Sequence, residues 1–347
     1  MIFINNNSFS FREIAFVSAQ KLSEKNLEIW EFEFWSFVAE WFNEKDFIKT
    51  KTSGSTGKPK TIFHKKKYCI ASAEATCKFF NLQKGNTALL CLPISSIGAK
   101  MMFIRSLVFD LDLYVQKPNS QPLEKIKIDI DFAAMVPLQV LSTFENNIEK
   151  WQYIKTLIIG GGVVNNSLKN KIEIAGLNAF STFGMTETIS HIALNKIGEN
   201  NNYNALENVF FTKNEDDCLV IEAKYLGIEK LETKDIINLK NHKTFEWLGR
   251  KDNAIESGGF KFLPEVLEQK ISSLISVPFF ISSLPNEKLN NEIVLIVNSK
   301  NRIISKEDLK TILDKYELPK QIFFLPKFKF LHSGKIDKKS SLALVKK

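Results

Sequence analysis

The stretch of residues 52–60, which reads Thr-Ser-Gly-Ser-Thr-Gly-Lys-Pro-Lys, constrains this chain more than any other. Its two glycines permit backbone conformations closed to other residues, so consecutive N–H groups can converge on one anion, and its hydroxyls and lysines add donors and positive charge. The spacing is not that of the Walker loop, which has four residues between its glycines. Residues 46–51 and 61–64 look like strands, so we expect this phosphate loop at the tip of a β-hairpin. The residues expected to contact phosphate are Thr52, Ser53, Gly54, Ser55, Thr56, Gly57 and Lys58.

Length and charge limit the classes of protein. A chain of 347 residues allows two or three domains. The net charge of +8 comes from lysines spread along the whole chain. A nucleic-acid partner would need a basic stripe interleaved with aromatic residues, so none is predicted, whereas polyanionic small ligands fit.

The cysteines and the apolar segments point to a cytoplasmic protein. No C-x-x-C pair or metal spacing occurs, so the four cysteines are expected to be reduced core residues. The N-terminus has no basic leader before an apolar core, and a signal peptide is not expected. The apolar residues 89–113 include four charged side chains, so no membrane insertion is expected.

The order of elements predicts the fold class. Residues 1–50 look helical, and residues 27–42 are too apolar for an exposed helix, so we expect that segment to dock on the core. Strand-like and helix-like segments then alternate as far as residue 183, which implies an α/β fold with layered, mainly parallel sheets. Short strands follow, with a break at residues 249–252. We therefore expect a large N-terminal domain, residues 1–250, and a small mobile α+β domain, residues 251–347.

The phosphate loop resembles the signature of the adenylate-forming superfamily, which includes acyl-CoA synthetases, luciferases and the adenylation domains of peptide synthetases. Further motifs follow in the family's order as far as Lys335, so the resemblance covers nearly the whole chain. It implies ATP, Mg²⁺ and coenzyme A as ligands. It also implies a small domain that rotates between two half-reactions.

Residues 182–187, Thr-Phe-Gly-Met-Thr-Glu, resemble the family's Tyr-Gly-x-Thr-Glu motif. The ring of Phe183 can cover one face of adenine, although phenylalanine lacks the phenol hydroxyl of the usual tyrosine. Thr186 can bind a phosphate oxygen, and Glu187 offers the hard carboxylate that Mg²⁺ prefers, the alternative being a surface carboxylate. A glycine-rich turn holds adenine in the family, and a plain tight turn is the alternative here. The candidates are Gly160, Gly161, Gly162 and Gly184.

Residues 233–235 stand where the family has Thr-Gly-Asp, whose aspartate accepts both ribose hydroxyls. Lys234 replaces the glycine, so the match to Asp235 is partial, and a solvated charge run is the alternative. Residues 249–252 and 257–260 resemble the family's hinge and the start of its small domain. The resemblance assigns ribose to Arg250, the hinge to Asp252, and the pantetheine arm of coenzyme A to Gly258 and Gly259.

Residues 333–337, Ser-Gly-Lys-Ile-Asp, resemble the family's last motif, whose lysine acts only in the first half-reaction. A carboxylate must attack an α-phosphate, and both groups are anionic. A cation between them, here Lys335, would stabilise the transition state.

Residues 92–105 resemble the acyl-pocket stretch of 2-succinylbenzoate–CoA ligases, with serine at the usual histidine. The expected acid-binding residues are Ser96, Lys100 and Arg105. An arginine in so apolar a helix needs an anionic partner, either a structural carboxylate or the distal carboxylate of the substrate.

These motifs favour an ATP-dependent acid–CoA ligase that acts through an acyl-adenylate, with 2-succinylbenzoate as the expected acid. The alternatives are a CoA ligase for another aryl or fatty acid, an enzyme that loads a carrier protein, and a catalytically dead nucleotide-binding module. The intact lysine, carboxylate and arginine positions argue against the last. Assembly as a homo-oligomer is compatible with the sequence.

Overall fold

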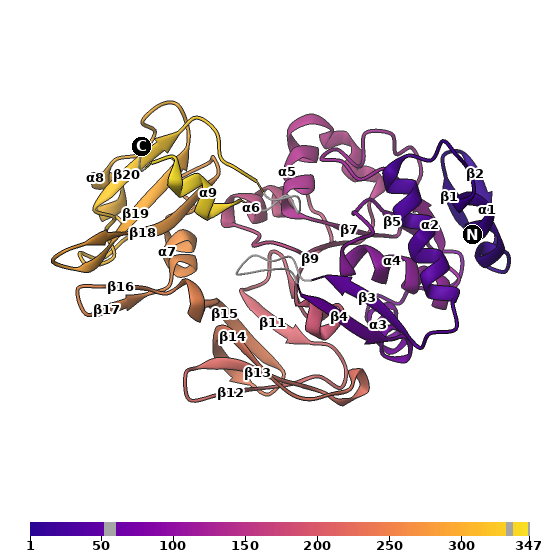
Figure 1. The fold of residues 1–347 in the computed structure, drawn as a ribbon. Coiled ribbons are helices and arrows are strands. Elements are labelled where there is room, and N and C mark those ends of the chain that lie inside the picture. Colours follow the sequence, from indigo (N-terminus) through magenta and orange to yellow (C-terminus); the bar gives the residue numbers. More distant parts are fainter. Residues whose placement is uncertain (52–59, 331–335, 346–347) are drawn as a thin grey trace. The chain divides into compact units, whose positions relative to one another are not determined.

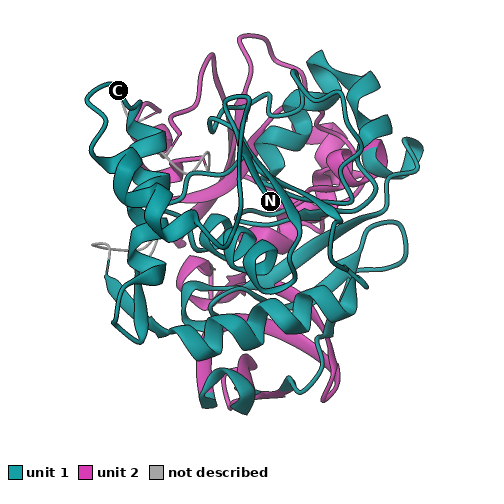
Figure 2. Cartoon of the chain, turned by 90° about the vertical axis from the view of Figure 1, so that its right-hand side faces the viewer, with its two compact units in different colours: residues 1–163, 172–210, 222–230 teal, residues 164–171, 211–221, 231–347 magenta. Residues whose placement is uncertain are grey.

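The computed structural model describes residues 1–51, 60–330 and 336–345. The chain forms two compact units, drawn in different colours in Figure 2. The first consists of residues 1–163, 172–210 and 222–230, and the second of residues 164–171, 211–221 and 231–347. The domain boundary expected after residue 250 stays a prediction.

A mainly parallel sheet forms the centre of the first unit, as predicted (Figure 1). Its strands lie in the order β11-β10-β9-β8-β7-β5-β6-β1-β2. The parallel strands are β1 (Ile2–Ile4), β5 (Thr87–Leu90), β6 (Asp112–Val115), β7 (Phe132–Met135), β8 (Leu157–Ile159) and β9 (Ala179–Gly184). The strands β2 (Asn7–Phe9), β10 (His191–Lys196) and β11 (Asn202–Ala205) pair antiparallel.

Helices pack on this sheet. They are α1 (Ile14–Leu22), α2 (Ile29–Phe42), α3 (Lys66–Phe79), α4 (Ile97–Val108), α5 (Pro137–Asn146) and the 3₁₀ segments η1 (Ile148–Tyr153), η2 (Thr186–Thr188) and η3 (Lys224–Leu226). Helix α4 contacts β5 and β6, and its residues 99–106 are all buried. The rings of Phe34 and Phe37 on α2 meet Phe103 on α4 edge to face, at centroid distances of 6.0 and 5.6 Å. The expectation that residues 27–42 dock on the core is confirmed.

The expectation of a wholly helical N-terminus is wrong. Residues 2–4 and 7–9 are strands, because Ile2 and Ile4 are buried where β1 adds to the edge strand β6. This pairing joins residues more than one hundred positions apart, and local periodicity does not report it. The expected hairpin strands are confirmed as β3 (Phe47–Lys51) and β4 (Thr61–Lys65), paired antiparallel.

Strands and short helices make up the second unit as far as residue 298. The strands β12 (Phe210–Lys213), β13 (Cys218–Ala223), β14 (Ile228–Asn241) and β15 (Thr244–Arg250) follow one another in the sheet. Next come η4 (Lys251–Asn253), the hairpin β16 (Ile255–Ser257) and β17 (Phe260–Phe262), and α7 (Pro264–Ile271). Helix α6 (Asn166–Ile174) lies largely in this unit's residues 164–171.

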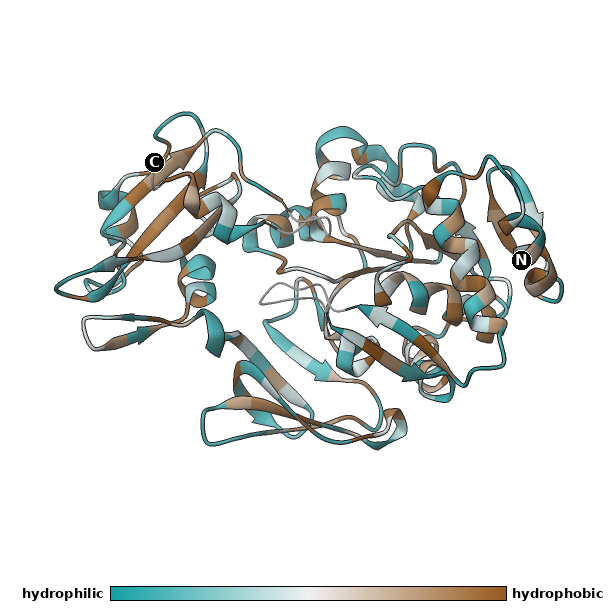
Figure 3. Cartoon of the chain, viewed as in Figure 1, coloured by the Kyte–Doolittle hydropathy of each residue, from teal (hydrophilic) through white to brown (hydrophobic). Residues whose placement is uncertain are grey.

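The C-terminal part of the second unit has its own small sheet. The strands β18 (Phe279–Asn286) and β19 (Asn290–Asn298) pair antiparallel, and β20 (Gln321–Leu325) joins β19 in parallel. Leu267, Ile271, Ile281 and Leu295 belong to its buried core, and β18 and β19 carry apolar colouring in Figure 3. Helices α8 (Lys306–Lys310) and α9 (Lys338–Ala343) complete it.

None of the helices in the described part of the chain has the length and apolar character needed to cross a bilayer.

Candidate functional site

Two of the predicted motifs lie side by side at one edge of the parallel sheet. Gly160 directly follows β8, and Gly184 ends β9, which pairs in parallel with β8 through Ile159 and Ser181. Carboxyl ends of parallel strands share one edge, which is where open α/β sheets bind ligands. The hydroxyl of Thr182 donates to the carbonyl of Ile159 at 3.3 Å and links the two ends. The structure therefore brings the Gly160–Gly162 turn and the Thr186-Glu187 motif together.

Two glycines at this edge are required by close contacts. A Cβ on Gly160 would lie 2.6 Å from Oγ1 of Thr182. A Cβ on Gly184 would lie 2.6 Å from Cα and 2.9 Å from N of His191, and would also meet the carbonyl oxygen of Ser190. These neighbours of Gly184 are backbone atoms of the strand paired with it, so they cannot turn away. The backbone at residue 184 is fixed by packing against the start of β10.

The chain reverses between β9 and β10 through a strained turn. Ile189 has φ 68° and ψ −51°, and the N–H of Ser190 donates to the carbonyl of Thr188 at 2.7 Å. This is a γ-turn with positive φ, a rare and strained conformation, and a β-branched residue is a genuine outlier there. Within the turn, the hydroxyl of Thr188 donates to the carbonyl of Ser190 at 2.8 Å. Strain of this kind clusters at functional sites.

The side chains of the predicted adenine and metal residues differ in burial. Phe183 is 9% exposed and meets the ring of Tyr203 edge to face at 5.7 Å. Tyr203 in turn shares a hydrogen bond of 2.9 Å with the hydroxyl of Ser181. Thr186 is half-buried, and Glu187 is exposed. An exposed carboxylate suits Mg²⁺, which is usually held by one or two carboxylates together with substrate phosphates.

The three predicted acid-binding residues all have partners within the first unit. Ser96 caps α4, because its hydroxyl accepts from the N–H of Ala99 at 3.2 Å. Lys100 donates to the carbonyl of Lys49 at 2.6 Å and lies 3.4 Å from the carboxylate of Glu40. Glu40 is thus a structural carboxylate partner for Lys100.

Arg105 is 1% exposed, and its Nη2 donates to the hydroxyl of Ser190 at 2.6 Å. Burial lowers the pKa of Arg105 from 12.5 to about 10, so the guanidinium stays charged at neutral pH. Among the described residues no carboxylate is paired with it, and its Nε has no hydrogen-bond partner there.

The second unit contains a separate cluster around Asp235. This carboxylate accepts from the indole N–H of Trp247 at 2.9 Å, and Nη1 of Arg250 lies 3.6 Å from its other oxygen. The register places Asp235 opposite Arg250 in the β14–β15 pair. Burial raises the pKa of Asp235, while Trp247 and Arg250 oppose the shift. The structure therefore brings together the two residues predicted to bind ribose.

The residues predicted for the hinge and for coenzyme A binding come after Arg250 along the chain. Nζ of Lys234 lies 2.9 Å from Oδ1 of Asp252. Asp252 is the middle residue of the 3₁₀ segment η4. Gly258 and Gly259 form the β16–β17 turn with φ of 56° and 82°, values that favour glycine. The N–H of Gly258 donates to the carbonyl of Leu289 at 3.0 Å.

Comparison with known proteins identifies the family. The model of the family described as AMP-binding enzyme matches residues 50–208. A solved acyl-CoA synthetase (AMP-forming)/AMP-acid ligase II-like protein from Dyadobacter fermentans is 30% identical, covers 94% of this chain and 97% of its own, and gives a TM-score of 0.61. The chain belongs to the AMP-binding enzymes. It is an AMP-forming acid–CoA ligase of the adenylate-forming superfamily.

Two further proteins similar to this chain are named as succinylbenzoate–CoA ligases or synthetases. The 2-succinylbenzoate–CoA ligase of Listeria monocytogenes is 24% identical over 318 residues, which are 83% of this chain and 68% of the relative. The o-succinylbenzoate CoA synthetase of Bacillus subtilis, solved with the acyl-adenylate intermediate, has a TM-score of 0.73 at 17% identity, over 97% of this chain and 81% of its own. At that identity the second match shows a shared fold.

Some of the predicted site residues lie outside the described part of the chain. These are the phosphate-contacting residues Thr52, Ser53, Gly54, Ser55, Thr56, Gly57 and Lys58, and the lysine of the last motif, Lys335. Their roles stay predictions.

Sequence reasoning missed three polar residues that support predicted site residues. In the first unit, Ser190 hydrogen-bonds Arg105, and its hydroxyl is 3.3 Å from Nδ1 of His191. In the second unit, Trp247 hydrogen-bonds Asp235. The signal available in the sequence was the polar pair Ser190-His191 at the start of the apolar strand β10. Buried polar side chains require hydrogen-bond partners, so this pair indicates a polar contact inside the protein.

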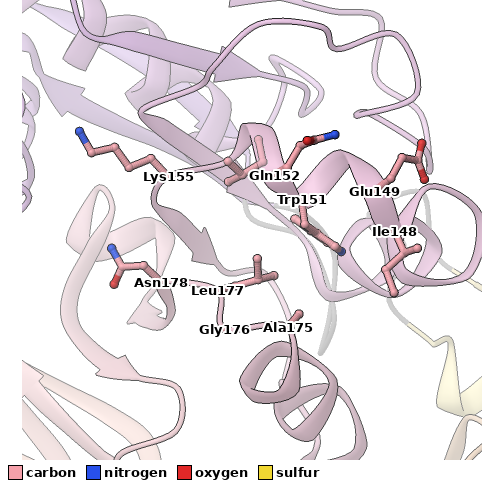
Figure 4. Close-up of a pocket in the computed structure, with 10 residues that line it drawn as sticks. Ile148, Glu149, Trp151, Gln152, Lys155, Ala175, Gly176, Leu177 and Asn178 are labelled. Carbon is pink, nitrogen blue, oxygen red and sulfur yellow. The ribbon is translucent and has the colours of Figure 1, made fainter.

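A hollow of about 590 Å³ lies elsewhere in the first unit (Figure 4). Its lining includes Lys155 and Asn178, which precede β8 and β9. It therefore sits at the amino ends of these strands, opposite the edge that carries Gly160 and Gly184. This position separates it from the AMP-binding motifs.

Proposed function

We propose that the acid activated by this ligase is 2-succinylbenzoate, and that the product is 2-succinylbenzoyl-CoA. The observation that carries the proposal is the match over 83% of the chain to a 2-succinylbenzoate–CoA ligase, together with further relatives of the same name. The motifs that the structure gathers at the sheet edge supply the groups that adenylation requires. The proposed role lies in menaquinone biosynthesis.

The reaction has two balanced steps. A carboxylate oxygen of the acid attacks the α-phosphorus of ATP, the bond between the α- and β-phosphates breaks, and pyrophosphate leaves. The thiol of coenzyme A then attacks the acyl carbonyl, AMP leaves with the electrons of the acyl–oxygen bond, and the thiol proton passes to solvent.

In this proposal the first unit holds the adenine and the reacting phosphates. The glycines after β8 leave backbone exposed for a flat base, and Phe183, supported by Tyr203, covers one face. Thr186 binds a phosphate oxygen, and Glu187 holds Mg²⁺, which neutralises charge on the phosphates. Residues 52–58 and Lys335 would contact the remaining phosphate oxygens.

The second unit supplies the ribose, hinge and coenzyme A residues. Asp235 is held by Trp247 through one oxygen, and its other oxygen, which faces Arg250, would accept ribose hydroxyls. Asp252 is the proposed hinge for rotation of residues 251–347. Gly258 and Gly259 would let the pantetheine arm pass close to backbone.

The acid-binding roles of Ser96, Lys100 and Arg105 stay predictions. The partners of Lys100 and the burial of Arg105 weigh against them, because a carboxylate reaches these groups only if neighbouring side chains move.

The four cysteines are free and buried, which supports the proposed cytoplasmic location. Burial raises the pKa of Cys69, Cys77 and Cys91 to about 12, so these thiols are unreactive at neutral pH.

Pyrophosphate release tests the proposed acid. The purified enzyme is given ATP, Mg²⁺ and one acid at a time, without coenzyme A. We expect kcat/KM to be at least tenfold higher for 2-succinylbenzoate than for benzoate or octanoate. A preference for octanoate would support the alternative of a fatty-acid ligase.

A further inference from the structure

A buried relay of hydrogen bonds runs from α4 to α3 beneath the strained turn. Nη2 of Arg105 is 2.6 Å from the hydroxyl of Ser190, and that hydroxyl is 3.3 Å from Nδ1 of His191. Nε2 of His191 is 3.2 Å from the hydroxyl of Thr76, which donates to the carbonyl of Ser72 at 3.1 Å. We call Arg105, Ser190, His191 and Thr76 the buried relay. All four are buried.

The chemistry of the groups fixes the direction of the relay. A guanidinium can only donate, so the hydroxyl of Ser190 accepts from Arg105 and its own proton is available for Nδ1 of His191. Neutral His191 then carries its proton on Nε2 and donates to Thr76. Burial and the charge of Arg105 hold the pKa of His191 well below its ordinary value, which keeps the ring neutral. Each hydroxyl and ring nitrogen in the relay therefore has a partner.

The relay ends at the backbone that supports the metal motif. Ser190 is the last residue of the γ-turn, and its carbonyl lies against Gly184. Only two residues separate Ser190 from Glu187, and the N–H of Ile189 donates to the carbonyl of Thr186 at 3.0 Å. Strained turns persist only where the surroundings over-determine them. The hydrogen bonds of the buried relay to Ser190 supply such a constraint on the turn.

We propose that Arg105, Ser190 and His191 are positioning residues that hold the strained turn so that Thr186 and Glu187 meet the Mg²⁺-bound phosphates of ATP. The inference rests on the proposed role of Glu187 and deepens it. It does not depend on which acid is activated, nor on coenzyme A.

Binding of nucleotide to Ser190→Ala, measured by titration calorimetry, tests the proposal. Ser106→Ala is the matched control, because Ser106 is a buried residue on α4 next to Arg105. Among the described residues, its hydroxyl bonds only the carbonyl of Met102 in its own helix, at 3.0 Å. Each protein is titrated with ATP in the presence of Mg²⁺ and again with a chelator. We expect Ser190→Ala to weaken Mg²⁺–ATP binding about tenfold, as for loss of a hydrogen bond to a charged group, and Ser106→Ala to change it less than twofold.

The chelator arm separates positioning from general loosening. A variant that merely loosened the fold would weaken ATP binding equally with and without Mg²⁺. Displacement of the turn should weaken binding more in the presence of Mg²⁺ than with the chelator, because the contact through Glu187 requires the metal. Equal losses in the two conditions, or equal losses in Ser190→Ala and Ser106→Ala, would overturn the proposal.

Variants at His191 give a second test that does not remove the Ser190 hydroxyl. In His191→Asn the amide oxygen can take the place of Nδ1 and accept from Ser190, whereas in His191→Gln the longer amide replaces Nε2 near Thr76. We expect His191→Asn to retain more Mg²⁺–ATP affinity than His191→Gln, and the reverse order contradicts the relay. If the wild type binds no Mg²⁺–ATP, the proposed function falls with it, whereas normal wild-type binding with unchanged variants removes the relay alone.

Discussion

Lys234 forms an ion pair with Asp252, at 2.9 Å between Nζ and Oδ1. The lysine stands where the family has glycine, and the aspartate is the proposed hinge. Arg250 lies 3.7 Å from the other oxygen of Asp252. The hydrogen bond from Lys234 lowers the pKa of Asp252, so this carboxylate is ionised at neutral pH.

If Asp252 is the hinge, this pair should slow the rotation that precedes thioester formation. We expect Lys234→Ala to speed the conversion of supplied acyl-adenylate to thioester by up to about fivefold, because an exposed ion pair contributes at most about 1 kcal/mol. Added salt should speed the wild type more than the variant, in which only the longer contact of Asp252 with Arg250 remains to be screened. The control is Lys240→Ala, which removes a pair with Glu246 on the same strands. Equal behaviour of the two variants would place the hinge elsewhere.

Gly184→Ala should destabilise the protein by about 1–3 kcal/mol, because the new Cβ meets backbone atoms of β10. Gly98→Ala is the control, since a Cβ there lies 3.7 Å from Leu92 and sits within α4. Alanine favours helix over glycine by up to about 1 kcal/mol, so this variant should be stabilised. Urea unfolding measures both free energies. A neutral Gly184→Ala would contradict the tight β9–β10 contact.

Stability should fall in acid because of His191. Its pKa is depressed in the folded state, so the unfolded chain binds more protons below the ordinary pKa of about 6.5. The contribution is fully present above pH 6.5 and is lost as the pH falls below it, at about 1.4 kcal/mol per unit. The pKa of His64 is also lowered by burial, but His64 is present in both the wild type and His191→Asn. A difference in slope between these two proteins therefore reports on His191. We expect His191→Asn to have a shallower slope between pH 8 and 5.5. An unchanged slope would show that His191 binds the same number of protons in the folded and in the unfolded protein.

Arg105→Leu distinguishes a positioning role from recognition of the acid. Because Arg105 is buried and bonded to Ser190, we expect the variant to lose activity by the same factor with 2-succinylbenzoate and with benzoate. Steady-state KM values for the two acids provide the measurement. A tenfold to hundredfold rise in KM for the dicarboxylate alone would instead assign its distal carboxylate to Arg105.

The parallel sheet and its helices were predictable because their signals are local. Each of the segments that became β5, α4, β7, α5 and β9 carries its own periodicity and turn residues. The strands β1 and β2 were missed because β1 is stabilised by pairing with β6, far along the chain.

The motifs of the site were predictable from short stretches, whereas their support was not. Ser190 receives its hydrogen bond from a residue 85 positions away, and His191 meets one 115 positions away. Such contacts leave no spacing in the sequence. Burial of Arg105 and Lys100 likewise depends on how α4 packs, so their availability to an acid could not be read from the residues.

The most direct test of the proposed function identifies the thioester that forms when three acids compete for coenzyme A. The enzyme is incubated with Mg²⁺, ATP, limiting coenzyme A and equimolar 2-succinylbenzoate, benzoate and octanoate, and the products are measured by mass spectrometry. We predict that 2-succinylbenzoyl-CoA dominates and appears in a one-to-one ratio with AMP. Octanoyl-CoA as the main thioester, or AMP formed without any thioester, would contradict the proposed function.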